Sequence, residues 1–184
     1  MKRSKLLLVL ALAMTVPLGL VGSPASAQPS GDTTVTFTVA TADLVIEVPE
    51  AADLGSAFPG ERVSGQLGEV EVLDQRAALA ATWTVTVTAS DFVTGDGDVP
   101  ELIISNSNVS YWSGPAVATT GLGTFVPGQP TADDEVSLDV PQVAFSKTSG
   151  SGVNTATWNP TLSVDIPESA VGGLYTGQVT HSVA

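Results

Sequence analysis

The chain has 184 residues and a formal net charge of −13, because 19 Asp and Glu residues outnumber six Lys and Arg residues. This charge excludes nucleic-acid binding, whose affinity comes largely from basic side chains that neutralise phosphates. Cysteine is absent and histidine occurs once, which argues against thiol catalysis and against a zinc site with several nitrogen or sulfur ligands.

Residues 1–27 have the order of a secretory signal peptide. Three basic residues among the first five precede the apolar stretch Leu6 to Val16, and the small residues Ala25-Ser26-Ala27 follow. This order predicts export and cleavage before Gln28, with an uncleaved anchor as the alternative. We expect residues 28–184 to be secreted, without membrane attachment, and to carry a formal charge of −16 from three basic and nineteen acidic side chains.

Apolar and polar side chains alternate along most of residues 28–184. Alternation with period two is typical of strands that bury one face. With no amphipathic helix of useful length, this predicts an all-β domain, a single antiparallel two-sheet β-sandwich that is immunoglobulin-like or jelly-roll-like. One Ala-rich segment, Gln75 to Ala81, is a short helix-like connection with room for a turn or two. The expected strands lie within 35–39, 44–48, 70–72, 83–87, 143–145, 162–166 and 175–183.

No catalytic arrangement is predicted, and we expect neither enzyme activity nor a cofactor. The single histidine, His181, has the parity of Tyr175, Val179 and Val183, so we expect it to pack with them. No Gly-x-Ser-x-Gly sequence occurs to place a serine nucleophile. Paired carboxylates for glycoside hydrolysis are the open alternative, because sequence spacing does not show which acids face each other.

Acidic residues crowd one loop, where Asp96, Asp98 and Glu101 are weak candidates for calcium ligands. Oxygen ligands suit calcium, but the spacing does not match the twelve-residue loop of a helix-loop-helix site. A solvated acidic loop is the favoured interpretation, since so acidic a chain must expose charge somewhere.

Tyr111 and Trp112 are adjacent aromatic residues before the turn Ser113-Gly114-Pro115. Adjacent strand residues point to opposite faces, so at least one ring is expected outside the core. An exposed ring beside small polar residues is able to stack on a sugar, and core packing is the alternative.

Two stretches resemble the WxL domain of Gram-positive cell-surface proteins. The first is "ATWTVTVTASDF", where Trp83-Thr84-Val85 has Val85 in place of the leucine. The second is "LSVDIPESAVGGLYTGQVTHSVA", where Tyr175 is followed at the family spacing by His181-Ser182-Val183 instead of a second Trp-x-Leu.

This resemblance implies an exported, non-catalytic module held non-covalently on peptidoglycan or another wall glycan, together with other surface proteins. It implies that Trp83 and Val85 form the first binding motif, and that Tyr175, His181 and Val183 form a degenerate second motif. Filling the interior of the sandwich is the alternative role for these side chains.

A fainter similarity links "AFPGERVSGQLGEVEVLD" to secreted jelly-roll proteins related to camelysin. It implies the alternative function, a structural subunit of an extracellular matrix or surface complex. Subunits of this kind commonly donate a terminal segment as a strand to a neighbour. Residues Thr33 to Val39 are the expected donor segment.

Overall fold

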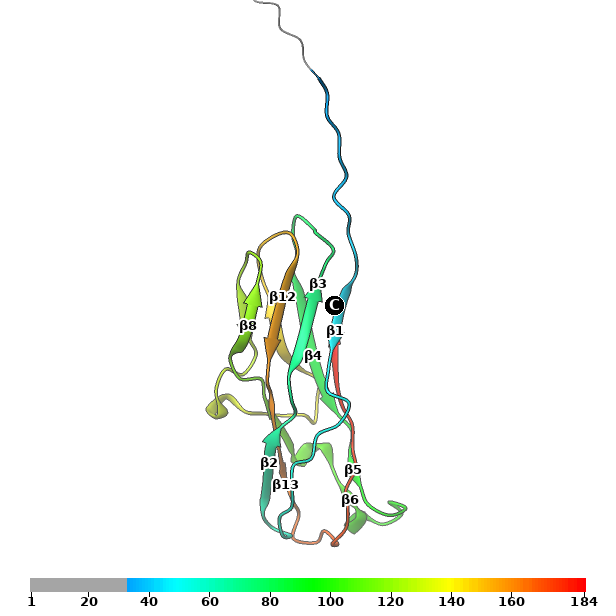
Figure 1. Ribbon diagram of the computed structural model, residues 1–184. Helices are drawn as coiled ribbons and strands as arrows, with labels where there is room; N and C mark the ends of the chain where they lie inside the picture. Colours follow the sequence, from blue (N-terminus) through cyan, green and yellow to red (C-terminus); the bar gives the residue numbers. More distant parts are fainter. Residues whose placement is uncertain (1–32) are drawn as a thin grey trace, which may run out of the picture. The chain divides into compact units, whose positions relative to one another are not determined.

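A computed structural model describes residues 33–184, so the predicted signal peptide lies outside the described residues. Residues Thr38–Ala184 form one unit, which consists of β-strands joined by loops and short 3-10 turns (Figure 1). No α-helix occurs within residues 33–184. The prediction of an all-β fold is confirmed.

All strand pairs are antiparallel and form three four-stranded sheets and one two-stranded pair. In spatial order, the first sheet contains β1 (Leu44–Glu47), β3 (Val70–Asp74), β12 (Asn154–Trp158) and β8 (Ala116–Thr120). The second contains β10 (Val136–Ser137), β7 (Val109–Trp112), β13 (Thr161–Asp165) and β2 (Arg62–Gln66). The third contains β14 (Val179–Val183), β4 (Trp83–Ala89), β11 (Gln142–Lys147) and β9 (Phe125–Pro127). The pair is β5 (Phe92–Val93) with β6 (Ile103–Ile104), and the 3-10 turns are η1 (Pro100–Leu102), η2 (Asn106–Asn108) and η3 (Ala132–Asp134).

The second sheet continues the first along three chain segments. β2 leads into β3, β7 into β8 and β12 into β13, and β2 and β13 lie below β3 and β12 in Figure 1. Gly68 and Gly114 interrupt two of these segments with positive φ values of 99° and 71°. Pro160, which has no N–H to donate to a ladder, interrupts the third. Local backbone chemistry therefore divides these long strands into two sheets.

The core consists of inward-facing side chains from all three four-stranded sheets. In β4, buried and exposed residues alternate from Trp83 to Val87, as the period-two pattern predicts. Phe145 of the third sheet stacks on Trp158 of the first, with ring centroids 4.8 Å apart. The largest fully buried apolar side chains are Trp158, Tyr111, Phe145, Leu138, Leu162, Val70, Val72, Val85, Val87 and Val109.

Two local predictions differ from the structure. The segment Gln75 to Ala81 contains no helix, because Ala77 has a φ of 51° and the Arg76 guanidinium bonds to the carboxylate of Asp74 and the carbonyl of Thr82. In β11, Val143 and Phe145 do not share a face, because the pairing with β4 shifts register between them. A bulge of this kind adds a residue to one strand and reverses the alternation.

Residues Thr33 to Val39 alternate as predicted but form no strand in the structure. Val35, Phe37 and Val39 are 80%, 87% and 69% exposed. A strand needs a neighbour to pair its backbone groups, and no other described segment pairs with this one. This segment therefore has the alternation of a strand, but none of residues 38–184 pairs with it.

Replacing Phe145 with alanine is expected to lower the free energy of unfolding by about 3–5 kcal/mol, because the ring is fully buried and stacked on Trp158. Phe58→Ala is the matched control, since Phe58 is 76% exposed, and it should change stability by no more than about 0.5 kcal/mol. Urea denaturation followed by tryptophan fluorescence measures both. Equal effects of the two changes would contradict the described core.

Candidate functional site

The first predicted motif lies in the core. Trp83 is 2% exposed and Val85 is fully buried. The Trp83 ring lies 6.3 Å from the rings of Phe125 and Phe145, measured between centroids, and its Nε1 donates a hydrogen bond of 2.9 Å to Oδ1 of Asn154. A ligand outside the domain does not reach these two side chains, so their predicted binding role gains no support from their placement.

A buried polar network holds the Trp83 indole in place. The Asn154 amide donates to Oδ2 of Asp74 over 3.1 Å, and Asp74 accepts two further bonds of 2.9 Å from the Arg76 guanidinium. These bonds from Arg76 hold the pKa of the buried Asp74 carboxyl below its usual range. The network therefore keeps its charges paired and fixes the ring orientation.

Lys147, the only lysine in residues 28–184, is also buried, which no pattern in the sequence predicts. Its Nζ donates to the main-chain carbonyls of Ala81 and Ser149 over 2.7 and 2.9 Å. Burial lowers the pKa of this amine. Since two main-chain carbonyls accept hydrogen bonds from its Nζ, Lys147 joins two loops at the end of the core.

The degenerate second motif pairs with the first. In the β14–β4 ladder, Val183 is opposite Val85 and His181 is opposite Val87. Val179, His181 and Val183 are all partly buried, so they share the inner face, as their parity predicts. Two stretches about a hundred positions apart in the sequence thus lie on neighbouring strands.

His181 contacts a phenol instead of an acid. Its Nε2 lies 3.1 Å from the Tyr111 hydroxyl oxygen, which also accepts a 3.4 Å hydrogen bond from Nε1 of Trp158. Burial lowers the pKa of His181 to about 4, so the imidazole is neutral at pH 7. Within residues 33–184, no salt bridge joins it to a carboxylate. This arrangement lacks the acid that would orient a catalytic base.

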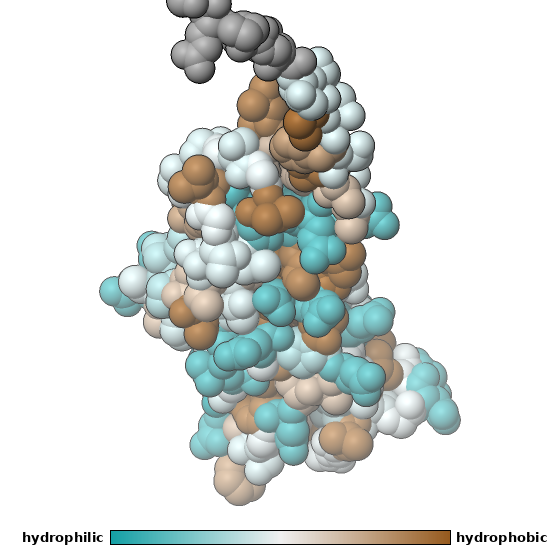
Figure 2. Space-filling view, turned by 45° about the horizontal axis from the view of Figure 1, so that its top comes forward, coloured by the Kyte–Doolittle hydropathy of each residue, from teal (hydrophilic) through white to brown (hydrophobic). Residues whose placement is uncertain are grey.

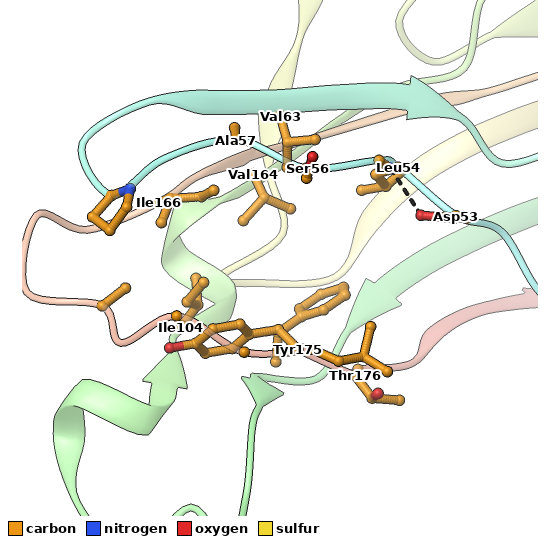
Figure 3. Close-up of a pocket in the computed structure, with 18 of the residues that line it drawn as sticks. Asp53, Leu54, Ser56, Ala57, Val63, Ile104, Val164, Ile166, Tyr175 and Thr176 are labelled. Atoms are coloured by element: carbon orange, nitrogen blue, oxygen red, sulfur yellow. Dashed lines mark hydrogen bonds between the residues drawn. The ribbon is translucent and has the colours of Figure 1, made fainter.

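Tyr175 lies apart from these residues, on the wall of an apolar groove of about 410 Å³ (Figure 3). Val63, Val164 and Ile166 line the opposite wall. The Tyr175 hydroxyl bonds to the carbonyls of Glu101 and Val171 over 3.0 and 2.9 Å, which fixes the ring.

The groove offers little for acid–base chemistry. Among its lining residues, Asp53 is the one carboxylate, and it accepts a bond from the Gly55 N–H. A smaller groove of about 350 Å³ adjoins it at Ala52, Leu54, Phe92 and Gly177 and reaches His181. Paired carboxylates, which glycoside hydrolysis requires, do not line the larger groove.

Trp112 lies on the opposite side of β7 from Tyr111. Tyr111 is fully buried, whereas Trp112 is only partly buried. The neighbouring residues on the same side of the second sheet are polar, but Ser110 is only partly exposed, and Thr161 and Ser163 are 8% and 4% exposed. Of the predicted aromatic binding residues, Trp112 is therefore the one on an outer sheet face.

The acidic loop gives no sign of a metal site. Among residues 33–184, no group of three His, Asp or Glu side chains lies close enough to hold a metal ion. The predicted calcium ligands Asp96, Asp98 and Glu101 therefore form no such group. In this same region, no helix is long and apolar enough to cross a membrane. On the face shown in Figure 2, apolar and hydrophilic side chains are interspersed.

Comparisons with known proteins do not place the chain in a family. No family model and no curated protein matches it. One similar solved structure is a family 123 glycoside hydrolase from Clostridium perfringens, with a TM-score of 0.36 and 16% identity. The match covers 70% of this chain and 19% of the hydrolase chain, so this chain spans about a fifth of that protein. A likeness this low supports no functional argument.

We predict that acid destabilises the domain partly through His181. Unfolding restores its pKa from about 4 to 6.5, so between these values the unfolded chain binds a proton that the folded chain does not. The contribution is complete above pH 6.5 and is lost as the pH falls towards 4, with an upper limit of about 3 kcal/mol. His181→Gln should flatten this part of the stability–pH curve in urea titrations. An unchanged slope in the variant would contradict the buried, neutral imidazole.

Proposed function

We propose that residues 28–184 form a secreted, non-catalytic module of the cell surface that associates non-covalently with peptidoglycan or another wall glycan. The observation that carries this proposal is the pairing of β14 with β4, which sets Val183 opposite Val85. The two stretches that resemble the WxL domain are thus neighbours, as one composite motif requires. The signal-like sequence of residues 1–27 agrees with an extracellular location.

We also propose that the three large sheets make a two-layer sandwich. The strands of the second sheet continue those of the first, which supports one long layer, and the third sheet packs against it through Phe145 and Trp158. Both layers are antiparallel and their inner faces share one core. An immunoglobulin-like or jelly-roll-like topology is the finer classification that we propose.

The buried motif residues favour a structural role for the motif itself. Trp83 and Val85 fix the interior, and His181 and Val183 close it from the neighbouring strand. On this proposal, glycan contacts come from the outer surface of the sandwich. The neutral His181, bonded to Tyr111, supports a module without hydrolase activity.

An assembly subunit is the second candidate function, and one observation favours it. Val35, Phe37 and Val39 alternate with threonines, are mostly exposed and lie in a segment without strand pairing. Such a segment has the pattern of a strand that completes the sheet edge of a second copy of the chain.

Purified residues 28–184 should co-sediment with peptidoglycan sacculi. The amount that sediments should exceed that of a control protein, a cysteine-free β-sandwich of similar charge. Binding by stacking and hydrogen bonds should persist at high salt, because salt screens mainly exposed charges. Binding through bridging cations would instead disappear with a chelator. No retention above the control protein would rule out the wall-associated function.

If the chain is an assembly subunit, it should form larger species as its concentration rises. The double change Val35→Asp and Phe37→Asp should prevent this, because a charge in the donated strand opposes burial. Leu79→Asp is the matched control, since Leu79 is 93% exposed outside this segment. Size-exclusion chromatography with light scattering measures both. A wild-type monomer at every concentration would exclude self-assembly.

A further inference from the structure

We propose that the apolar groove between residues 49–57 and residues 172–177 is the acceptor site for residues 33–39 of a second copy of the chain. This inference rests on the second candidate function, the assembly subunit, and names the site that receives the donated strand. We call residues 33–39 the donor segment. We call the two adjoining hollows, of about 410 and 350 Å³, the acceptor groove.

The floor of the acceptor groove follows strand β13. Val164 and Ile166 line its larger part, where Figure 3 shows them, and Leu162 lines its smaller part. These three side chains occur at every second position and belong to the core or pack against it. Four residues of strand span about 13 Å. The groove therefore has three apolar positions in a row over that length.

The rim of the acceptor groove carries apolar side chains that are exposed to water. Leu174 is 85% exposed, Val171 is 49% exposed and Val48 is 48% exposed, and all three line the groove. Exposed apolar side chains gathered around a hollow are typical of a surface that binds another protein segment. A strand that lies in the groove would remove them from water.

Both walls have main-chain groups that are available to a strand. Within the described part of the chain, no main-chain hydrogen bond joins residues 49–57 to another segment. Residues 172–175 also make none to the described residues, whereas the next residue, Thr176, forms an isolated bridge with Val93 of β5. An added strand needs partners for its N–H and C=O groups. The two walls are able to provide them.

The donor segment has the pattern that this groove requires. Val35, Phe37 and Val39 occur at every second position and are 80%, 87% and 69% exposed, and the residues between them are threonines. Successive side chains of a strand point to opposite faces. As a strand in the groove, the segment would place its three apolar side chains on the floor and its threonines towards solvent.

Charge favours this occupant over an acidic segment. Residues 33–42 contain no charged side chain. The acceptor groove is lined by two carboxylates, Glu50 and Asp53, and by no lysine or arginine. Because residues 28–184 carry a formal charge of −16, two copies repel each other, and a neutral segment adds nothing to that repulsion. Self-association should therefore strengthen as salt screens the charges.

Each copy has both halves of the contact, one donor segment and one acceptor groove. Donation from one copy to the next is a heterologous contact, since two different surfaces meet. Every added copy leaves one segment and one groove unused at the ends, so the contact repeats without closing. This is the behaviour that an assembly subunit requires.

A synthetic peptide of residues 33–42 tests the groove. It is titrated by calorimetry into the Val35→Asp, Phe37→Asp variant, whose own donor segment is disabled. We expect binding, and we expect Ala52→Trp in the same background to weaken it at least tenfold, because Ala52 lines both parts of the groove. Ala80→Trp is the matched control, since Ala80 is also exposed but lies outside the groove. Near-UV circular dichroism checks that each variant is folded.

Cysteine pairs locate the contact between full-length copies, because the chain has no cysteine of its own. Thr36→Cys is mixed with Leu174→Cys at the rim of the groove, or with Val117→Cys on the exposed edge strand β8. We expect the oxidised heterodimer with Leu174→Cys at a yield at least tenfold higher. Preferential coupling to Val117→Cys would make β8 the acceptor and overturn the groove assignment.

The outcomes separate this inference from the assembly function. If larger species form but Ala52→Trp changes neither them nor peptide binding, the assembly function stands and the groove is wrong. If the peptide binds the groove but the chain stops at a dimer, two copies exchange segments, so the groove stands and the assembly function fails. If wild type stays a monomer and only the double variant binds the peptide, the segment occupies its own groove and the second-copy assignment is wrong. If the peptide does not bind and no larger species form, both fail.

Discussion

The packing of Trp158 joins the three large sheets and determines the rest of the structure. Its ring stacks on Phe145 of the third sheet, and its Nε1 donates to Tyr111 of the second. Tyr111 in turn holds His181 on the last strand. One indole from the first sheet therefore organises the whole interior, which explains how a domain without disulfides keeps a defined core.

Charged side chains are tolerated in this interior because each of them has hydrogen-bond partners. Asp74 receives Arg76 and Asn154, and the Lys147 amine is held by two carbonyls. A buried charge without partners would cost several kcal/mol (roughly 3–5). The same network positions Trp83, so the first motif residue contributes to the fold before any question of binding arises.

Alternation in the sequence predicted the strands that pair with a neighbouring strand, such as β3, β4 and β14. The prediction was wrong where strand pairing, and not the alternation itself, determines the structure. Residues 33–39 alternate without a pairing partner, and β11 contains a bulge that no propensity marks. All five residues of the edge strand β8 are exposed, so no apolar side chain alternates between core and solvent there, and the sequence shows no strand pattern. Of the site, the opposite orientations of Tyr111 and Trp112 followed from adjacency, but the pairing of Val183 with Val85 depends on register between distant strands.

Register also determines which side chains of the second sheet face the core. A slip of one residue would bring Ser110 and Trp112 inside and expose Tyr111, so the burial of Tyr111 against Trp158 directs Ser110 and Trp112 away from the core. The interior therefore specifies not only stability but also which side chains meet solvent.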